Sequence, residues 1–207
     1  MNRGGATITG YNREFELKEK FNEFISTKIT GVPEDYYSRL TVNDFEEMKT
    51  TLKDIHNIIT YKTSLHFVDW LSEQFPYVRE NYQLYLQQLL ATKPSDNGYD
   101  LVVSGEVNII AEIKCNKPIN GGYKFGSAQK NGIIKDIRGL LEGKSKVKGI
   151  NANTCYKFLV IYDFGEHTLK ATQHLLRNID IDLQGRVEIY GDNTNINLRN
   201  VFIVFIN

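Results

Sequence analysis

The chain has 207 residues, of which 41% are hydrophobic and 24% charged, a balance that is typical of one globular domain and excludes a disordered or fibrous protein. Its 25 basic and 25 acidic side chains cancel, so a polyanionic partner would have to meet a local basic patch. There is no apolar run of about 18 residues, no signal-peptide pattern at the N-terminus and no CxxC pair, so we expect a cytoplasmic protein with reduced thiols and no membrane partner.

Three helices are predicted before residue 76, because apolar residues recur there at three- and four-residue steps. The first covers residues 12–27, and the second covers residues 41–59, where Asn43 or Asp44 can cap the start. The third covers residues 64–75 and ends at Pro76. We expect residues 1–62 to form an N-terminal helical extension packed on a core that spans residues 63–207.

Residues 82–92, with the sequence YQLYLQQLLAT, fit two structures equally well. Tyr82, Leu84 and Leu86 alternate as in a strand, whereas Tyr82, Leu86 and Leu89 follow the spacing of a helix. Periodicity does not choose between them, so this segment stays open.

The character of the chain changes after a turn signal at residues 93–98. The run DLVVSGEVNIIAEIK predicts a β-hairpin over residues 100–114. A glycine-rich loop at residues 120–122 then leads to a helix over residues 127–142, which Gly143 ends. A strand over residues 156–162, a helix over 168–177 and strands near 186–190 and 201–206 complete the order, which predicts an α/β or α+β fold around a mixed sheet.

The hairpin would carry the polar residues on one face if its loop is Ser104-Gly105-Glu106 and Val103 faces Val107. Strand alternation then gives one wholly apolar face, made of Leu101, Val103, Val107, Ile109, Ala111 and Ile113. The other face holds Asp100, Val102, Asn108, Ile110, Glu112 and Lys114. In this register Asp100 lies opposite Ile110 and diagonal to Glu112.

Two carboxylates held a few ångströms apart repel each other unless a cation neutralises them, and such oxygen ligands suit Mg²⁺, with Mn²⁺ as a substitute. A neighbouring lysine such as Lys114 can position an attacking water, while the ion polarises a phosphoryl oxygen. The residue types therefore indicate hydrolysis of a phosphodiester.

Asp100 followed by Glu112-Ile113-Lys114 in a strand resembles the motif of the PD-(D/E)XK nuclease superfamily, and the resemblance covers about residues 64–162. Tyr99 stands where that motif has its proline. The resemblance implies a restriction-endonuclease-like αβββαβ core with a central mixed sheet flanked by helices. It also implies Asp100, Glu112 and the backbone carbonyl of Ile113 as metal ligands, and Lys114 as the catalytic lysine.

Many members of the superfamily place another acid on the helix before the sheet, which here favours Glu73 as a further metal ligand, with Glu80 behind it. In the helix over residues 127–142, Gln129 and Lys130 lie one turn before the apolar stripe, so we expect both to face the site. Lys117, Lys124 and Lys130 lie close in sequence to the start of this helix, where they could hold phosphates of the nucleic acid.

Simpler readings compete with this one. A lone Glu-x-Lys in a strand is usually a solvated ion pair, and the lysine run over residues 144–148 is more often a solvated loop than a phosphate contact. The four histidines show no ligand spacing and are read as surface or core residues.

The sequence thus predicts a Mg²⁺-dependent endodeoxyribonuclease that cleaves duplex DNA in the manner of a restriction endonuclease, with Gln129 supporting the substrate phosphate. Cutting both strands is easiest for two symmetric sites, so we expect a homodimer. The alternatives are a non-catalytic nucleic-acid or protein-binding module on the same fold, or a nuclease for branched or single-stranded DNA or for RNA.

Overall fold

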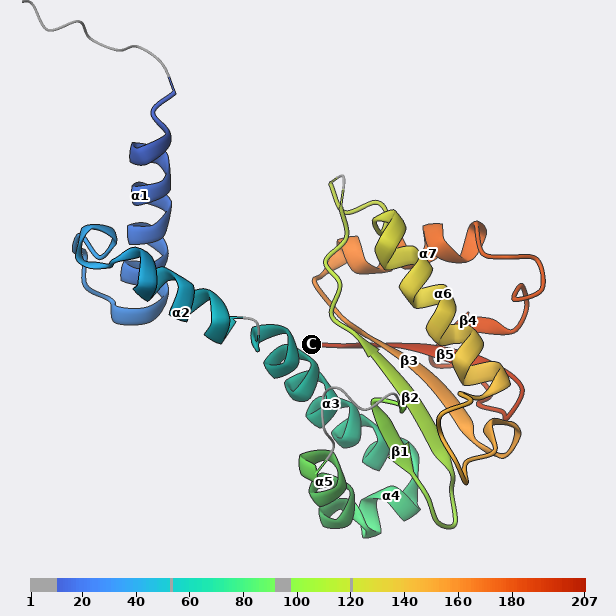
Figure 1. The fold of residues 1–207 in the computed structure, drawn as a ribbon. Helices are drawn as coiled ribbons and strands as arrows, with labels where there is room; N and C mark the ends of the chain where they lie inside the picture. The colour runs from blue at the N-terminus through green and yellow to red at the C-terminus, as the bar shows by residue number, and fades with distance from the viewer. Residues whose placement is uncertain (1–10, 53, 92–97, 120) are drawn as a thin grey trace, which may run out of the picture. The chain divides into compact units, whose positions relative to one another are not determined.

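The structure is a computed structural model that describes residues 11–207 except residues 53, 92–97 and 120 (Figure 1). The turn signal at 93–98, apart from Gly98, and the first residue of the glycine-rich loop therefore lie outside the described residues. The chain divides into two compact units, Met1–Asp54 and Ile55–Asn207. The boundary lies before the expected one at residue 62, because a single helix continues from Ile55 into the core.

The N-terminal unit is a small helical element without a buried core. It contains α1 (Arg13–Phe24), a π-helical turn (Ile25–Thr30), a 3₁₀ turn (Tyr37–Arg39) and α2 (Val42–Leu52), and none of these elements buries a residue. Phe21, Tyr37 and Phe45 form an aromatic cluster with ring centroids 5.3–6.3 Å apart. Aromatic contacts of this kind, rather than a closed core, hold the unit together.

The helix predicted over residues 41–59 is two helices. α2 ends at Leu52 and α3 begins at Ile55. The hydroxyls of Thr50 and Thr51 donate to the carbonyls of Glu46 and Glu47 one turn earlier, at 2.9 and 3.1 Å, a pattern that weakens and bends a helix. Thr41, and neither Asn43 nor Asp44, is the N-cap of α2: its Oγ1 accepts from the Asp44 N–H at 3.3 Å, and the Asp44 carboxylate accepts from the Thr41 N–H at 2.7 Å, as in a capping box.

Three helices open the second unit: α3 (Ile55–Gln74), α4 (Pro76–Glu80) and α5 (Tyr82–Ala91). Pro76 ends α3 as predicted and then occupies the first turn of α4, where its missing N–H costs nothing. The described part of the open segment at residues 82–92 is helical from Tyr82 to Ala91, and Tyr85 and Leu89 are its buried residues. The packing of Tyr85 and Leu89 in the core next to the sheet selects the helix, a choice that periodicity alone did not make.

A five-stranded sheet in the order β1-β2-β3-β5-β4 forms the centre of this unit. β1 (Leu101–Val103) runs antiparallel to β2 (Ile109–Lys114), whereas β3 (Tyr156–Tyr162), β5 (Val201–Ile206) and β4 (Val187–Ile189) extend β2 in parallel. The parallel crossovers use α6 (Ser127–Glu142), a 3₁₀ turn (Ala152–Thr154) and α7 (Glu166–Arg177). The predicted helix over 127–142 and the strands over 156–162 and 201–206 are confirmed.

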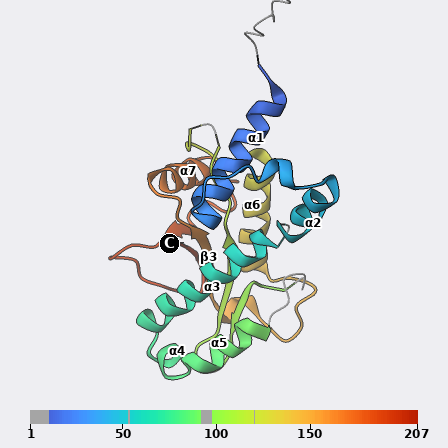
Figure 2. The same cartoon turned by 90° about the vertical axis from the view of Figure 1, so that its left-hand side faces the viewer.

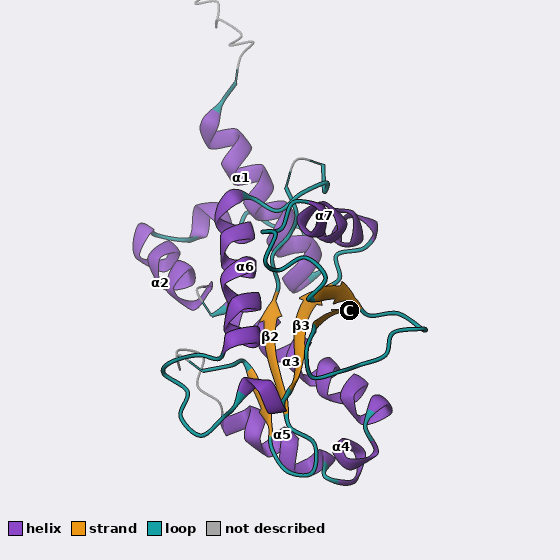
Figure 3. Cartoon of the chain, turned by 90° about the vertical axis from the view of Figure 1, so that its right-hand side faces the viewer, coloured by secondary structure: helices purple, strands orange, loops and turns teal. Residues whose placement is uncertain are grey.

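Helices cover both faces of the sheet. On one face α3, α4 and α5 pack against alternate residues of the strands, including Leu101, Ala111 and Phe158 (Figures 1 and 2). On the other face α6 and α7 pack against Ile110 and Leu159 (Figure 3). The mixed α/β class is thus confirmed. Between α3 and α6 the described residues form two strands, β1 and β2, whereas an αβββαβ core has three strands between its two helices.

The register of the hairpin differs from the predicted one by two residues. Val103 pairs with Ile109 and Leu101 with Ala111, so the connection spans residues 104–108. The main chain of Asn108 already accepts a hydrogen bond from Tyr156 N–H at 2.8 Å, and pairing with β1 begins one residue later. Because a two-residue shift preserves strand alternation, both predicted faces are correct.

None of the helices in the described part of the chain has the combined length and apolar character that a membrane span requires.

Candidate functional site

Asp100 lies directly before β1, and its side chain continues the strand pairing where the backbone of β1 ends. Its Oδ2 accepts a hydrogen bond from the backbone N–H of Ile113 at 2.7 Å. The pairing of Leu101 with Ala111 places Asp100 beside Glu112 rather than diagonal to it, as the sequence analysis had it. The corrected register brings the two carboxylates closer together than the predicted one.

Glu112 is a buried carboxylate, with only 3% of its surface exposed. Burial raises its pKa to about 7, and the neighbouring charge of Asp100 adds to this, although Lys144 acts in the opposite direction. A carboxyl group poised in this way binds a proton or a cation readily, since either would relieve the cost of an isolated buried charge.

Lys144 is the partner of Glu112 that sequence reasoning missed. Its ammonium forms an ion pair with Glu112 Oε1, donates to the carbonyl of Gly98 at 2.7 Å and lies 5.1 Å from the ring centroid of Tyr99. Lys144 directly follows Gly143, the residue at which α6 ends, so the end of this helix places Lys144 beside the hairpin. The expectation that residues 144–148 form a solvated loop is wrong for Lys144, whose side chain is 23% exposed.

Lys114 forms an ion pair with Asp136 of α6, at 2.6 Å between Nζ and Oδ2. Burial lowers the pKa of Lys114, but Asp136, and at longer range Asp100 and Glu112, outweigh that effect and raise the pKa. Lys114 is therefore charged at neutral pH. It can orient a water or a phosphate oxygen by donating hydrogen bonds, and it cannot accept the proton of that water.

These side chains line one pocket of about 510 Å³ between the hairpin and α6. Its carboxylates are Asp100, Glu112 and Asp136, and its lysines are Lys114, Lys135, Lys144 and Lys146. A pocket with acidic groups at its base and lysines around it can hold a cation and an anionic substrate side by side.

The oxygen donors of this pocket fit a hard divalent cation. Within the part of the chain that the structure describes, no group of three or more carboxylate, imidazole or thiol side chains could hold a metal ion. Mg²⁺ does not need such a group, because it keeps several waters and binds through one or two carboxylates. Asp100 and Glu112 supply these. Ile113 turns its N–H towards Asp100, and since a strand residue points its N–H and C=O to the same edge, its carbonyl faces that edge too.

Glu73 and Glu80 do not come to this pocket. Both are exposed, and they belong to α3 and α4, which cover the opposite face of the sheet. The acid that a helix contributes is Asp136, from the helix after the hairpin instead of the helices before it.

Gln129 closes the first turn of α6. Its Oε1 accepts from the N–H of Gly126 at 2.8 Å, and its Nε2 donates to the carbonyl of Lys117 at 3.2 Å. Both ends of the amide are used in fixing the loop to the helix, as in a capping box. The side chain does not line the carboxylate pocket, so its position favours a structural role over the predicted catalytic one.

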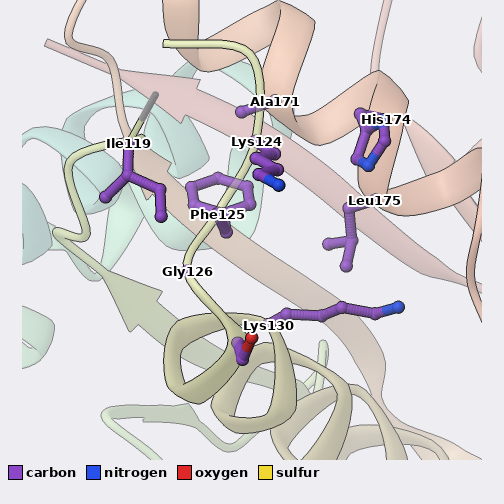
Figure 4. A pocket seen from close by; sticks show the side chains of 9 residues that line it. Ile119, Lys124, Phe125, Gly126, Lys130, Ala171, His174 and Leu175 are labelled. Carbon is purple, nitrogen blue, oxygen red and sulfur yellow. The ribbon is translucent and has the colours of Figure 1, made fainter. Parts of the chain in front are cut away.

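Lys124 and Lys130 line a different pocket, of about 240 Å³, together with His174 (Figure 4). This pocket lies between the start of α6 and α7, and Lys130 Nζ donates to the carbonyl of Asn178 at 3.2 Å. Lys117 is exposed and lines neither pocket. The three predicted phosphate-binding lysines thus lie outside the carboxylate pocket.

Comparisons with family models, with curated proteins and with solved structures found no match to this chain. The residues of the pocket, and the resemblance of their spacing to the nuclease motif, are therefore the basis for a functional proposal.

Proposed function

We propose that this chain is a metal-dependent endonuclease that hydrolyses phosphodiester bonds in DNA, with duplex DNA as its substrate. The observation that carries the proposal is the buried carboxylate of Glu112 beside Asp100, in one pocket with the charged amine of Lys114. Burying one acid next to another destabilises a fold, so a site of this composition is best explained by a bound cation.

Asp100, Glu112 and the carbonyl of Ile113 would hold Mg²⁺, or Mn²⁺ in its place. When bound, the ion supplies Lewis-acid polarisation of the phosphoryl oxygen and neutralises charge at the leaving oxygen. Asp100 needs little rearrangement, because the Ile113 N–H already holds its carboxylate in place, whereas Glu112 would exchange its ion pair with Lys144 for the cation.

Lys114 orients the attacking water and stabilises negative charge on the phosphate, and Asp136 positions the lysine for this task. Lys135 and Lys146 lie at the pocket where the DNA backbone would pass, and both are exposed. Lys144 neutralises Glu112 through their ion pair, and it would be available to a neighbouring phosphate if Glu112 held a cation instead.

A homodimer would place two such pockets on the two strands of a duplex. The N-terminal unit supports this, because it exposes apolar side chains that no other part of the same unit covers, among them Phe15 and Phe24.

The first experiment is a cleavage assay with mixed-sequence duplex DNA in Mg²⁺ or in EDTA. We expect fragments only with Mg²⁺, and roughly a 100-fold or larger loss of rate in Lys114→Ala, because a charge-stabilising donor is removed from the transition state. Lys148→Ala is the matched control, since Lys148 is exposed and does not line the pocket. Equal rates in the two variants would contradict the proposal.

One observation favours the alternative of a non-catalytic binding module. The two lysines already pair with two acids, so the pocket is largely neutralised without an ion. The same assay separates the two functions. Intact DNA in every lane, with a shifted band in a gel-retardation experiment that Mg²⁺ does not affect, would support the binding module.

A further inference from the structure

A second cationic pocket lies at the other end of the parallel strands. Lys157 is the second residue of β3, Arg186 directly precedes β4, and Asn200 directly precedes β5. Parallel strands begin at the same edge of a sheet, so these residues meet there. Glu112 and Lys114 belong instead to the carboxyl-terminal half of β2.

Lys157 is the most unusual residue of this pocket, because it is a lysine with only 1% of its surface exposed. Its Nζ donates to the carbonyl of Cys155 at 2.9 Å and to that of Leu198 at 2.5 Å. An ammonium has three donors, and no described residue takes the third. Burial lowers the pKa of Lys157; Cys155 acts in the opposite direction, and the charge of Arg186 adds to the lowering.

Arg186 and Arg199 bring two more cations to the same pocket, which has a volume of about 510 Å³ and also contains the amides of Asn153 and Asn200. None of its lining residues is acidic. Two acids lie near the pocket: Asp182 pairs with Arg138 at a shortest distance of 2.5 Å and also feels the charge of Arg186, and Glu188 accepts from Asn200 of the pocket at 2.9 Å. Among the described residues, neither arginine of the pocket forms an ion pair.

We propose that this pocket binds the phosphate group of a small phosphorylated molecule, at a site separate from the carboxylate pocket. Lys157, Arg186 and Arg199 line one pocket without forming an ion pair among the described residues, so their charges repel one another, and a bound anion would reduce that cost. Guanidinium groups offer paired N–H donors that match the oxygens of a phosphate.

The surroundings of the pocket suit a ligand larger than the phosphate alone. An adjoining hollow shares Leu198, Arg199 and Asn200 with it and adds Tyr156 and Ile196. Cationic groups at one end and an aromatic and an aliphatic side chain at the other form the usual composition of a small-molecule site. A mononucleotide has this distribution of charge and apolar surface.

The test is isothermal titration of the full chain with inorganic phosphate and with adenosine monophosphate, at constant ionic strength set by chloride. EDTA in every solution keeps metal out of the carboxylate pocket, so the result does not depend on the proposed nuclease activity. We expect both ligands to bind, with an affinity roughly tenfold lower or worse in Arg199→Gln and in Arg186→Gln, since each removes a charged hydrogen bond.

Arg177→Gln is the control, because Arg177 is an exposed arginine on α7 that does not line the pocket. The arginine variants carry the test because they change exposed residues, whereas replacing buried Lys157 could unfold the chain. The proposal is overturned if neither small ligand binds, including the case in which only an oligonucleotide does. It is equally overturned if Arg177→Gln weakens binding as much as Arg199→Gln.

Discussion

At the scale of single residues, Glu112 combines a position in the proposed metal site with a cost in stability. Its pKa in the folded chain is about 7, above its ordinary value of 4.5, because the side chain is buried beside Asp100. The folded state therefore binds a proton more tightly than the unfolded state does. Stability from this group is fully present below pH 4.5 and is lost as the pH rises through about 7.

Glu112→Gln should remove this pH dependence, because glutamine keeps the shape of the protonated acid. In EDTA, we expect the variant to match the original chain near pH 4.5 and to be more stable near pH 8, by roughly 1–3 kcal/mol. Urea unfolding at a series of pH values measures the difference. Glu106→Gln, in the exposed hairpin loop, is the control. A Glu112→Gln variant less stable at pH 8 than the original chain would show that the ion pair with Lys144 outweighs burial.

The sequence predicted those residues of the site that a local pattern places together. It missed a residue whose position depends on contacts between segments far apart in the chain. Asp100 and Glu112 share a face because strand alternation has a period of two, which is readable locally. Asp136 left a signal: it stands three residues after Ile133 and four before Leu140, within the apolar stripe of α6. Lys144 left none, because its contact with Glu112 depends on where α6 ends relative to the hairpin.

At the scale of elements, α6 connects the two sides of the carboxylate pocket. Its first turn is fixed by Gln129, its middle supplies Asp136, and its end leads to Lys144. The bounds of this helix were predictable from the Ser127 start, the apolar stripe and Gly143. The sequence did not predict that α6 supplies the helical acid of the pocket. Whether that acid comes from a helix before or after the hairpin depends on which face of the sheet each helix covers.

Gln129→Ala tests whether this glutamine acts on structure or on chemistry. We expect a loss of about 1 kcal/mol in the free energy of unfolding, typical for a helix cap, while cleavage persists at temperatures where the variant is folded. Gln129→Glu should restore only part of the stability, since a carboxylate also accepts from the Gly126 N–H but cannot donate to the carbonyl of Lys117. Cleavage abolished in a Gln129→Ala chain of unchanged stability would return this residue to the catalytic group.

At the scale of the whole molecule, every buried residue in the described part of the chain lies at or after Thr63. Hydrophobic burial is the main stabilising term in folding, so the unit from Ile55 onwards contains what it needs to fold. The order of the predicted helices and strands indicated the α/β class, but the helical state of residues 82–91 and the unit boundary depended on packing that no local pattern contains.

A fragment of residues 55–207 should therefore unfold cooperatively, with a urea midpoint close to that of the full chain. If the N-terminal unit forms the dimer, light scattering should show a dimer for the full chain and a monomer for the fragment. An unfolded fragment would show that residues 1–54 stabilise the sheet unit.

The hydrogen bond from the Ile113 N–H to Asp100 makes one carboxylate serve both the hairpin and the site. Replacing Asp100 would cost strand pairing as well as activity, whereas replacing buried Glu112 would relieve an electrostatic penalty. The residues of the site would therefore not disappear together in a lineage that no longer needed the activity. Drift would remove Glu112 early and keep an acceptor at position 100, so an inactive descendant would still carry half of the motif.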